Sequence, residues 1–177
     1  MTIAGPETEP LDAPAGWAAR GLSLRARTEG DRPFLRDLYG SFRAAELAPV
    51  PWSDAEKAEF LDSQFALQTI HFDRFFPHAD FLIIEEAGTP TGRLYLDRKP
   101  DGFLVVDIGF LPHRRGAGLG TALLRHVHAQ AARAGASRVW LHVLEENPGA
   151  RLLYERLGFR GIEGGEGPYR RMAWPVS

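Results

Sequence analysis

A strand, a basic glycine loop and the start of a helix follow one another between Val105 and Leu124, in the sequence VVDIGFLPHRRGAGLGTALL. Gly116, Gly118 and Gly120 alternate directly after two arginines. Glycine lacks a Cβ, so this backbone can turn tightly and bring its N–H groups against a ligand. The first N–H groups of a helix have no internal partners, and the helix dipole makes that end positive. The order predicts a phosphate or diphosphate site, with a tight strand–helix connection that binds nothing as the alternative.

The bulk properties exclude several classes of protein. A length of 177 residues with 44% hydrophobic residues suits one globular domain. The net charge of -2 gives no electrostatic case for binding nucleic acid or an anionic membrane. Cysteine is absent, which removes disulfides and cysteine nucleophiles, and the histidine spacing predicts no metal site. We expect a cytoplasmic protein that does not insert into membranes, with a flexible leader over residues 1–20 and a single domain over 21–177.

Hydrophobic periodicity predicts a mixed sheet with flanking helices. Strands are expected over 22–27, 81–85, 93–98, 103–111 and 139–144, with turns at 88–92 and 100–102, and a final hairpin is expected over 159–162 and 169–174. Helices are expected from 28–31 to about 47, from 53 to about 76, from the glycine loop to 135, and from 147 to 158. Consecutive strands joined by short turns predict an antiparallel meander, and the later strand–helix–strand order predicts a parallel pair.

Two motifs carry a resemblance to a known family. The run Arg115-Gly-Ala-Gly118-Leu-Gly120 resembles the R/Q-x-x-G-x-G/A signature of the GNAT superfamily of N-acetyltransferases. The downstream run LHVLEENPGARLLYERLGF is similar to the second signature of that family. A dinucleotide-binding fingerprint or a P-loop would need other glycine spacings or a lysine, and neither fits. Over residues 22–174, the resemblance implies an α/β (α+β) fold with six to seven strands, an antiparallel N-terminal meander and a splayed parallel central pair.

The resemblance implies acetyl-CoA as the acyl donor. Its pyrophosphate would lie on the N–H groups of Arg115, Gly116, Ala117, Gly118, Leu119, Gly120 and Thr121. Backbone groups of Phe110 and Leu111, on the splayed strand, would bind the pantetheine, and a main-chain N–H would polarise the thioester carbonyl. Asn147 is carried over as a contact to the cofactor arm, with a simple helix N-cap as its alternative.

Two residues carry the expected chemistry. The family uses a tyrosine at the position of Tyr154 as the general acid for the departing thiolate, and a phenol with a pKa of about 10 is protonated as that role requires. A packed core tyrosine is the alternative. Asp107 is the one acid in an apolar strand, where burial would raise its pKa toward that of a useful base. A cross-strand polar contact is its alternative, and Glu145, Glu146, His71 or a water chain are other candidate bases.

The acceptor site is the least determined feature. In the family, the segment between the first two strands forms much of it, which here contains Gln64, Gln68 and His71 on one helix face; a solvated helix edge is the alternative. We predict an N-acetyltransferase that transfers acetyl from acetyl-CoA to a primary amine of a small molecule or peptide by direct attack. A non-catalytic CoA-binding module is the alternative, and an enzyme acting on charged tRNA would need a basic patch. The oligomeric state stays open, a homodimer included.

Overall fold

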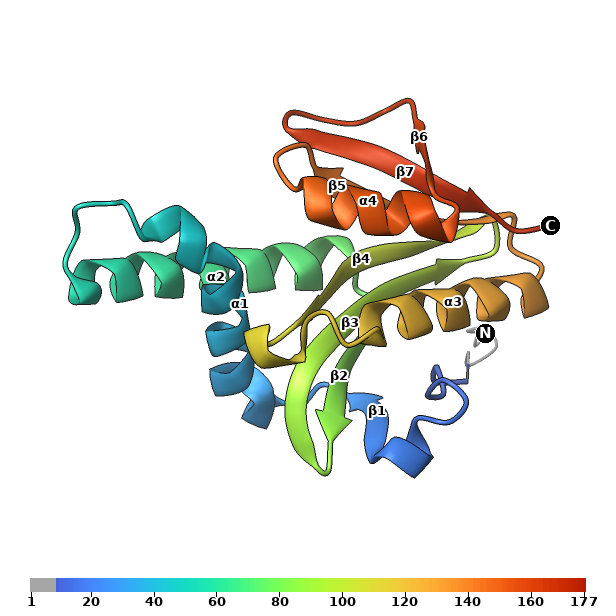
Figure 1. The fold of residues 1–177 in the computed structure, drawn as a ribbon, viewed down its shortest axis with the longest axis horizontal. Helices are drawn as coiled ribbons and strands as arrows, with labels where there is room; N and C mark the ends of the chain where they lie inside the picture. The colour runs from blue at the N-terminus through green and yellow to red at the C-terminus, as the bar shows by residue number, and fades with distance from the viewer. Residues whose placement is uncertain (1–8) are drawn as a thin grey trace, which may run out of the picture.

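The structure, a computed structural model, describes residues 9–177, which form seven strands and four α-helices (Figure 1). In chain order these are β1 Leu22–Ala26, α1 Arg32–Leu47, α2 Asp54–Phe75, β2 Asp80–Glu86, β3 Thr89–Lys99, β4 Gly102–Phe110, α3 Leu119–Arg133, β5 Arg138–Leu144, α4 Pro148–Leu157, β6 Arg160–Ile162 and β7 Tyr169–Pro175. Every predicted strand and helix is present. The turn expected over 88–92 is shorter, because Ala87 and Gly88 adopt positive φ angles and β3 already begins at Thr89.

The strands form one mixed sheet in the order β1-β2-β3-β4-β5-β7-β6. The pairs from β1 to β4 are antiparallel, which confirms the predicted meander, and β4 pairs with β5 in parallel. The final hairpin is also present, but β7 lies between β5 and β6. Figure 1 shows β5, β7 and β6 with α4 as one half of the molecule, beside the half built on β1 to β4.

Short local motifs begin the helices where the sequence predicted. Before α1, the Thr28 N–H donates to Asp31 Oδ2 at 2.7 Å in a capping box. A second capping box at Ser53 begins α2. The Ala150 N–H donates to Asn147 Oδ1 at 3.1 Å at the start of α4. These caps satisfy donors that a helix start otherwise leaves without partners, so they fix the position of each start.

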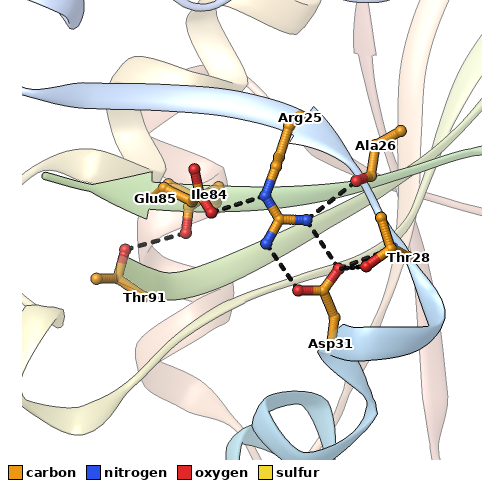
Figure 2. Close-up of polar contacts among 7 residues, drawn as sticks. All are labelled: Arg25, Ala26, Thr28, Asp31, Ile84, Glu85 and Thr91. Atoms are coloured by element: carbon orange, nitrogen blue, oxygen red, sulfur yellow. Dashed lines mark hydrogen bonds and ion pairs between the residues drawn. The ribbon is translucent and has the colours of Figure 1, made fainter. Parts of the chain in front are cut away.

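Arg25 joins the edge of the sheet to the first helix (Figure 2). Its Nε donates to Glu85 Oε1 at 2.7 Å on β2, and Nη1 and Nη2 donate to the two Asp31 carboxylate oxygens at 2.8 and 2.7 Å. Hydrogen bonds from Arg25 lower the pKa of the Asp31 carboxyl to about 2. The planar fork of an arginine suits this bidentate contact, which holds the start of α1 against β1.

Two cores cover the two faces of the sheet. The main core joins α3 and α4 to the sheet and contains, among others, Leu94, Val105, Leu123, Val127, Leu141, Leu157 and Phe159. The smaller core joins α1 and α2 to the other face through Leu35, Tyr39, Phe65 and Ile83. Only Phe65 and Phe72 of α2 are buried, and Phe75 is 60% exposed. A narrow inner stripe suffices because a single helix face contacts the sheet.

The described part of the expected leader packs against the domain. Leu11 and Trp17 are buried members of the main core. The carbonyl of Asp12 lies 2.8 Å from Nε2 of His126 on α3. The segment 9–20 is therefore attached through apolar burial that its proline-rich composition did not indicate. Residues 1–8 of the expected leader lie outside the described residues.

Candidate active site

The central feature of the site is the early separation of β4 from β5. The two strands pair only from Phe103 with Val139 to Val105 with Leu141. Beyond these residues β4 continues to Phe110 without β5 as a partner, and its residues 106–109 become half-buried. We call this region, where the two parallel strands separate, the splay. It confirms the predicted splayed pair, and it leaves one backbone edge of β4 without a strand neighbour.

A β-bulge sets the direction of the side chains beside the splay. Tyr95 pairs with Asp107 and Leu96 pairs with Val105, so Val106 is an extra residue on β4. Bulges bend a strand and redirect its side chains, and they are common next to active sites. Here the bulge places the Asp107 side chain on the face that α1 and α2 cover, where it contacts Arg93.

The glycine loop follows β4 and ends at the exposed start of α3. Gly116 and Gly118 have φ angles of 75° and 78°, a left-handed conformation that other residues rarely adopt. Gly118 is the N-cap of α3, and no side chain caps this helix. Within the described chain, the N–H groups of residues 116–121 have no hydrogen-bond acceptor. The loop therefore offers free donors at the positive end of a 15-residue helix, which is the arrangement that favours an anion.

The two arginine side chains of the loop are held by the protein. Arg115 Nε donates to the Phe110 carbonyl at 2.9 Å, and its Nη2 donates to Ser41 Oγ at 3.0 Å. Arg114 Nη2 donates to Glu86 Oε1 at 2.9 Å. Both guanidinium groups thus fasten the end of β4 to neighbouring elements, although Arg114 Nε itself has no hydrogen-bond partner within residues 9–177.

Tyr154, the predicted general acid, projects from α4 and packs against the main core. Burial and the negative charge of Asp107 raise the pKa of the Tyr154 phenol to about 12. The charge of Asp107 thus acts on Tyr154 across the sheet, although burial is the larger cause of the shift. A phenol with a raised pKa stays protonated at neutral pH, as a proton donor must.

Asp107 is not an isolated acid. Its Oδ2 accepts a hydrogen bond from Arg93 Nε at 2.5 Å, and Arg93 is only 1% exposed. The Nη2 of Arg93 donates to Gln68 Oε1 on α2 at 3.0 Å. Sequence analysis missed Arg93, although an arginine in an apolar strand of the same meander as a lone acid is a usable signal. The cross-strand contact weighed as the alternative for Asp107 is therefore present.

The three residues of the predicted acceptor row are not equivalent in the structure, because only Gln68 lines the hollow that α2 shares with β1. Asp73 of α2 accepts from Arg27 Nη2 near the end of β1 at 2.8 Å. Gln64 and Asp73 are nine residues apart, which at about 100° per residue places them half a turn apart. Gln64 and His71 thus lie on the side of α2 away from the contact between Arg27 and Asp73. Only Gln68 of the row has a hydrogen bond to the Arg93–Asp107 pair. The exposed His71 ring lies against Phe75 in a tilted arrangement, with the ring centres 4.7 Å apart.

A hollow lies on the β1 side of α2. Its volume is about 310 Å³, and its lining includes Arg27, Gln68, Asp73, Arg93 and Tyr95. Gln68, the middle residue of the row, belongs to this lining, whereas Gln64 and His71 do not. Within residues 9–177 no group of three or more acidic, histidine or cysteine side chains is placed to hold a metal ion. No helix in the same range is both long and apolar enough to cross a membrane.

Comparison with known proteins gives one family. Residues 35–159 match the acetyltransferase (GNAT) family. Mycothiol acetyltransferase of Thermobispora bispora is 30% identical over 141 residues, which are 78% of this chain and 41% of that protein. The chain spans less than two thirds of the length of the curated relatives that it matches.

Solved structures share the fold at low sequence identity. The PaiA N-acetyltransferase of Thermoplasma acidophilum, in complex with coenzyme A, has a TM-score of 0.65 at 16% identity and covers 87% of this chain and 98% of its own. Spermidine N-acetyltransferase of Vibrio cholerae, in complex with CoA and spermine, has a TM-score of 0.60 at 21% identity and covers 88% of this chain and 96% of its own. Similarity at this level shows the fold.

Proposed function

This chain belongs to the GNAT family of acetyltransferases, and from that premise we propose that it transfers an acetyl group from acetyl-CoA to a primary amine. The observation that carries the proposal is the protonated Tyr154 at the splay, beside a glycine loop with free N–H donors. The direct attack of an amine in a ternary complex fits a chain without cysteine, because no acetyl-cysteine intermediate can form.

Different residues of the chain would bind the donor and transfer the proton. The free N–H groups of residues 116–121 would bind the diphosphate of the donor, whereas the Arg115 N–H already donates to the Pro112 carbonyl at 3.3 Å. The unpaired edge of β4 near Phe110 and Leu111 would bind the pantetheine arm, and the Leu111 N–H and carbonyl would have to leave their present partners, Thr91 and Arg114, to take part. The Phe110 carbonyl already accepts from Arg115, so its share of this contact requires the arginine to shift or to share the oxygen. Tyr154 would donate its proton to the departing sulfur. Asn147 caps α4, and its contact to the donor remains a prediction.

The acceptor would enter over the face that carries Asp107, beneath α2. Gln64, Gln68 and His71 lie toward that side, and Phe75 adds an exposed aromatic ring. This lining, with neutral polar groups beside aromatic rings, favours a small, partly apolar amine. CoA-bound structures of the same fold, one of them with spermine, support the pairing of CoA with an amine.

Two measurements test the proposal in sequence. Isothermal titration with acetyl-CoA should give micromolar or tighter binding, which Gly118→Val should weaken strongly because valine does not adopt the left-handed conformation of Gly118. A panel of benzylamine, tyramine, spermidine and a short peptide is then assayed with a thiol reagent, whose background is low because the protein has no cysteine. Binding without turnover of any amine would favour the non-catalytic CoA-binding module. Failure of the wild type to bind acetyl-CoA would remove the proposal altogether.

A further inference from the structure

His142 stands on β5 at the point where the splay begins. Val139, Leu141 and Val143 are buried in the main core, so strand alternation turns the side chains of Trp140 and His142 to the opposite face. Leu141 is the last β5 residue that pairs with β4. His142 is therefore the first residue of β5 beyond the pairing, and its side chain is exposed.

The same face of β4 carries Asp107. Leu104 pairs with Trp140, and Tyr95 pairs with Asp107, whose carboxylate contacts Arg93 on the face that α1 and α2 cover. His142 and Asp107 thus flank the splay from its two strands on one face, which is the face of the predicted acceptor row. Tyr154 reaches the splay from α4, which packs with the main core on the other face.

The surroundings of His142 keep its imidazole uncharged at neutral pH. Partial burial and the positive charge of Arg171, its cross-strand partner on β7, lower its pKa from 6.5, and Glu166 opposes this shift. The Arg171 guanidinium lies over Trp140 at 4.9 Å, and the Trp140 ring is 5.5 Å from the imidazole. In residues 9–177 neither ring nitrogen of His142 has a hydrogen-bond partner, so one of them is free to accept a proton.

The contrast with Asp107 separates the two candidates for a base. The Asp107 carboxylate already accepts a hydrogen bond from the buried Arg93, which would lose its ion-pair partner if the acid took up a proton. A buried guanidinium without its counter-charge is costly. His142 has no ion-pair partner among residues 9–177, so its protonation does not leave a buried charge without a counter-charge.

We propose that His142 is the general base of the acetyl transfer, and that Asp107 serves to position Arg93 and Gln68 rather than to take the proton. This proposal rests on the proposed function. The amine nitrogen attacks the thioester carbonyl carbon, a C–N bond forms and the C–S bond breaks. The amine proton passes to a free ring nitrogen of His142, and the Tyr154 phenol supplies the proton that the thiolate receives. The imidazolium then returns its proton to water, and Tyr154 is reprotonated.

The pH profile of kcat/KM tests this assignment, with the most active amine of the panel and with methoxyamine, a weak base that is largely unprotonated at neutral pH. In the wild type, kcat/KM should fall on the acidic side with an apparent pKa below 6.5 for both amines. His142→Gln should lose about 100-fold or more in kcat/KM and lose this acidic limb, while acetyl-CoA binding stays within about twofold. His78→Gln, which changes an exposed histidine in a loop, is the matched control and should behave as the wild type.

A second readout does not depend on turnover. In NMR titrations, the ring proton signal that His142→Gln removes should titrate below the ordinary histidine range and shift when acetyl-CoA is added. An acidic limb that persists unchanged in an active His142→Gln variant would overturn the assignment, as would a His142 signal that titrates above 6.5. Either result leaves the proposed function intact, because that function fails only if the wild type does not bind acetyl-CoA or does not turn over amines.

Discussion

Tyr154 and Asp107 lie close enough at the splay for the negative charge of the carboxylate to raise the pKa of the phenol. The two side chains come from opposite faces of the sheet, Tyr154 from α4 and Asp107 from β4 beneath α2. Between these two faces, β4 and β5 stop pairing after Val105 and Leu141. In the proposed function, the separation of the two strands would let a proton donor and an acceptor amine act on one thioester.

Replacing Tyr154 by phenylalanine removes the proton donor and keeps the ring. We expect kcat to fall by about 100-fold to 10,000-fold, the usual contribution of a general acid, with acetyl-CoA affinity nearly unchanged. Because the pKa of Tyr154 is raised to about 12, the wild type should show no alkaline loss of activity from this group up to about pH 10. Tyr169→Phe, at an exposed tyrosine of β7, is the control, and equal losses in both variants would contradict the assignment.

Removing Asp107 should destabilise the protein through Arg93. Asp107→Ala leaves a guanidinium that is 1% exposed without its counter-charge, and we expect the free energy of unfolding to fall by about 3 kcal/mol. Adding Arg93→Met removes that charge and should recover half of the loss or more. Chemical denaturation of the single and double variants measures both values.

The double variant also bears on the chemistry. If His142 takes the proton, Asp107→Ala/Arg93→Met should keep the acidic limb of the wild-type kcat/KM profile, even if its rate is lower. If the folded double variant loses the acidic limb of its kcat/KM profile, Asp107 rather than His142 is the general base.

The contact between Phe42 and Gly109 should respond to substitution in a paired manner. A Cβ on Gly109 would overlap the Phe42 ring, so Gly109→Ala should destabilise the protein by about 1–3 kcal/mol. Phe42→Ala in the same chain should relieve most of this clash, which makes the double variant less destabilised than the sum of the single ones. Gly92→Ala is the contrasting control, because its Cβ would lie 2.6 Å from the Gly109 carbonyl and the Phe42 truncation cannot relieve it. Strict additivity of Phe42→Ala and Gly109→Ala in thermal or chemical unfolding would contradict the contact.

The Arg25–Asp31 fork should make stability depend on acid pH. The pKa of Asp31 is lowered in the folded chain from 3.8 to about 2, so the ionised carboxylate stabilises the fold above pH 3.8, and this contribution disappears as the pH falls toward 2. Asp31→Asn should therefore lower the free energy of unfolding by about 2 kcal/mol at pH 7, and the difference should shrink below pH 4. The exposed Asp37→Asn is the control. If the free energy of unfolding of Asp31→Asn is lower by the same amount at every pH, the loss comes from the capping box rather than from the ion pair.

The sequence by itself determined the order and type of the elements, because these depend on signals within a few residues. The capping boxes at Thr28 and Ser53, the Asn147 cap and the alternation of apolar residues each act over one turn or one strand. The glycine loop could also be predicted from the sequence, because the left-handed conformations of Gly116 and Gly118 are local properties of the backbone.

Only the tertiary structure decided which side chains meet. Arg93 finds Asp107 through a strand register that contains a bulge, and neither residue signals its partner from 14 positions away. The burial of Trp17, the inward turn of Arg115 to Phe110 and the exposure of His142 at the splay depend likewise on elements far apart in the chain. Local patterns fix conformation, but contacts across a sheet depend on register and packing, which arise only when the whole chain is assembled.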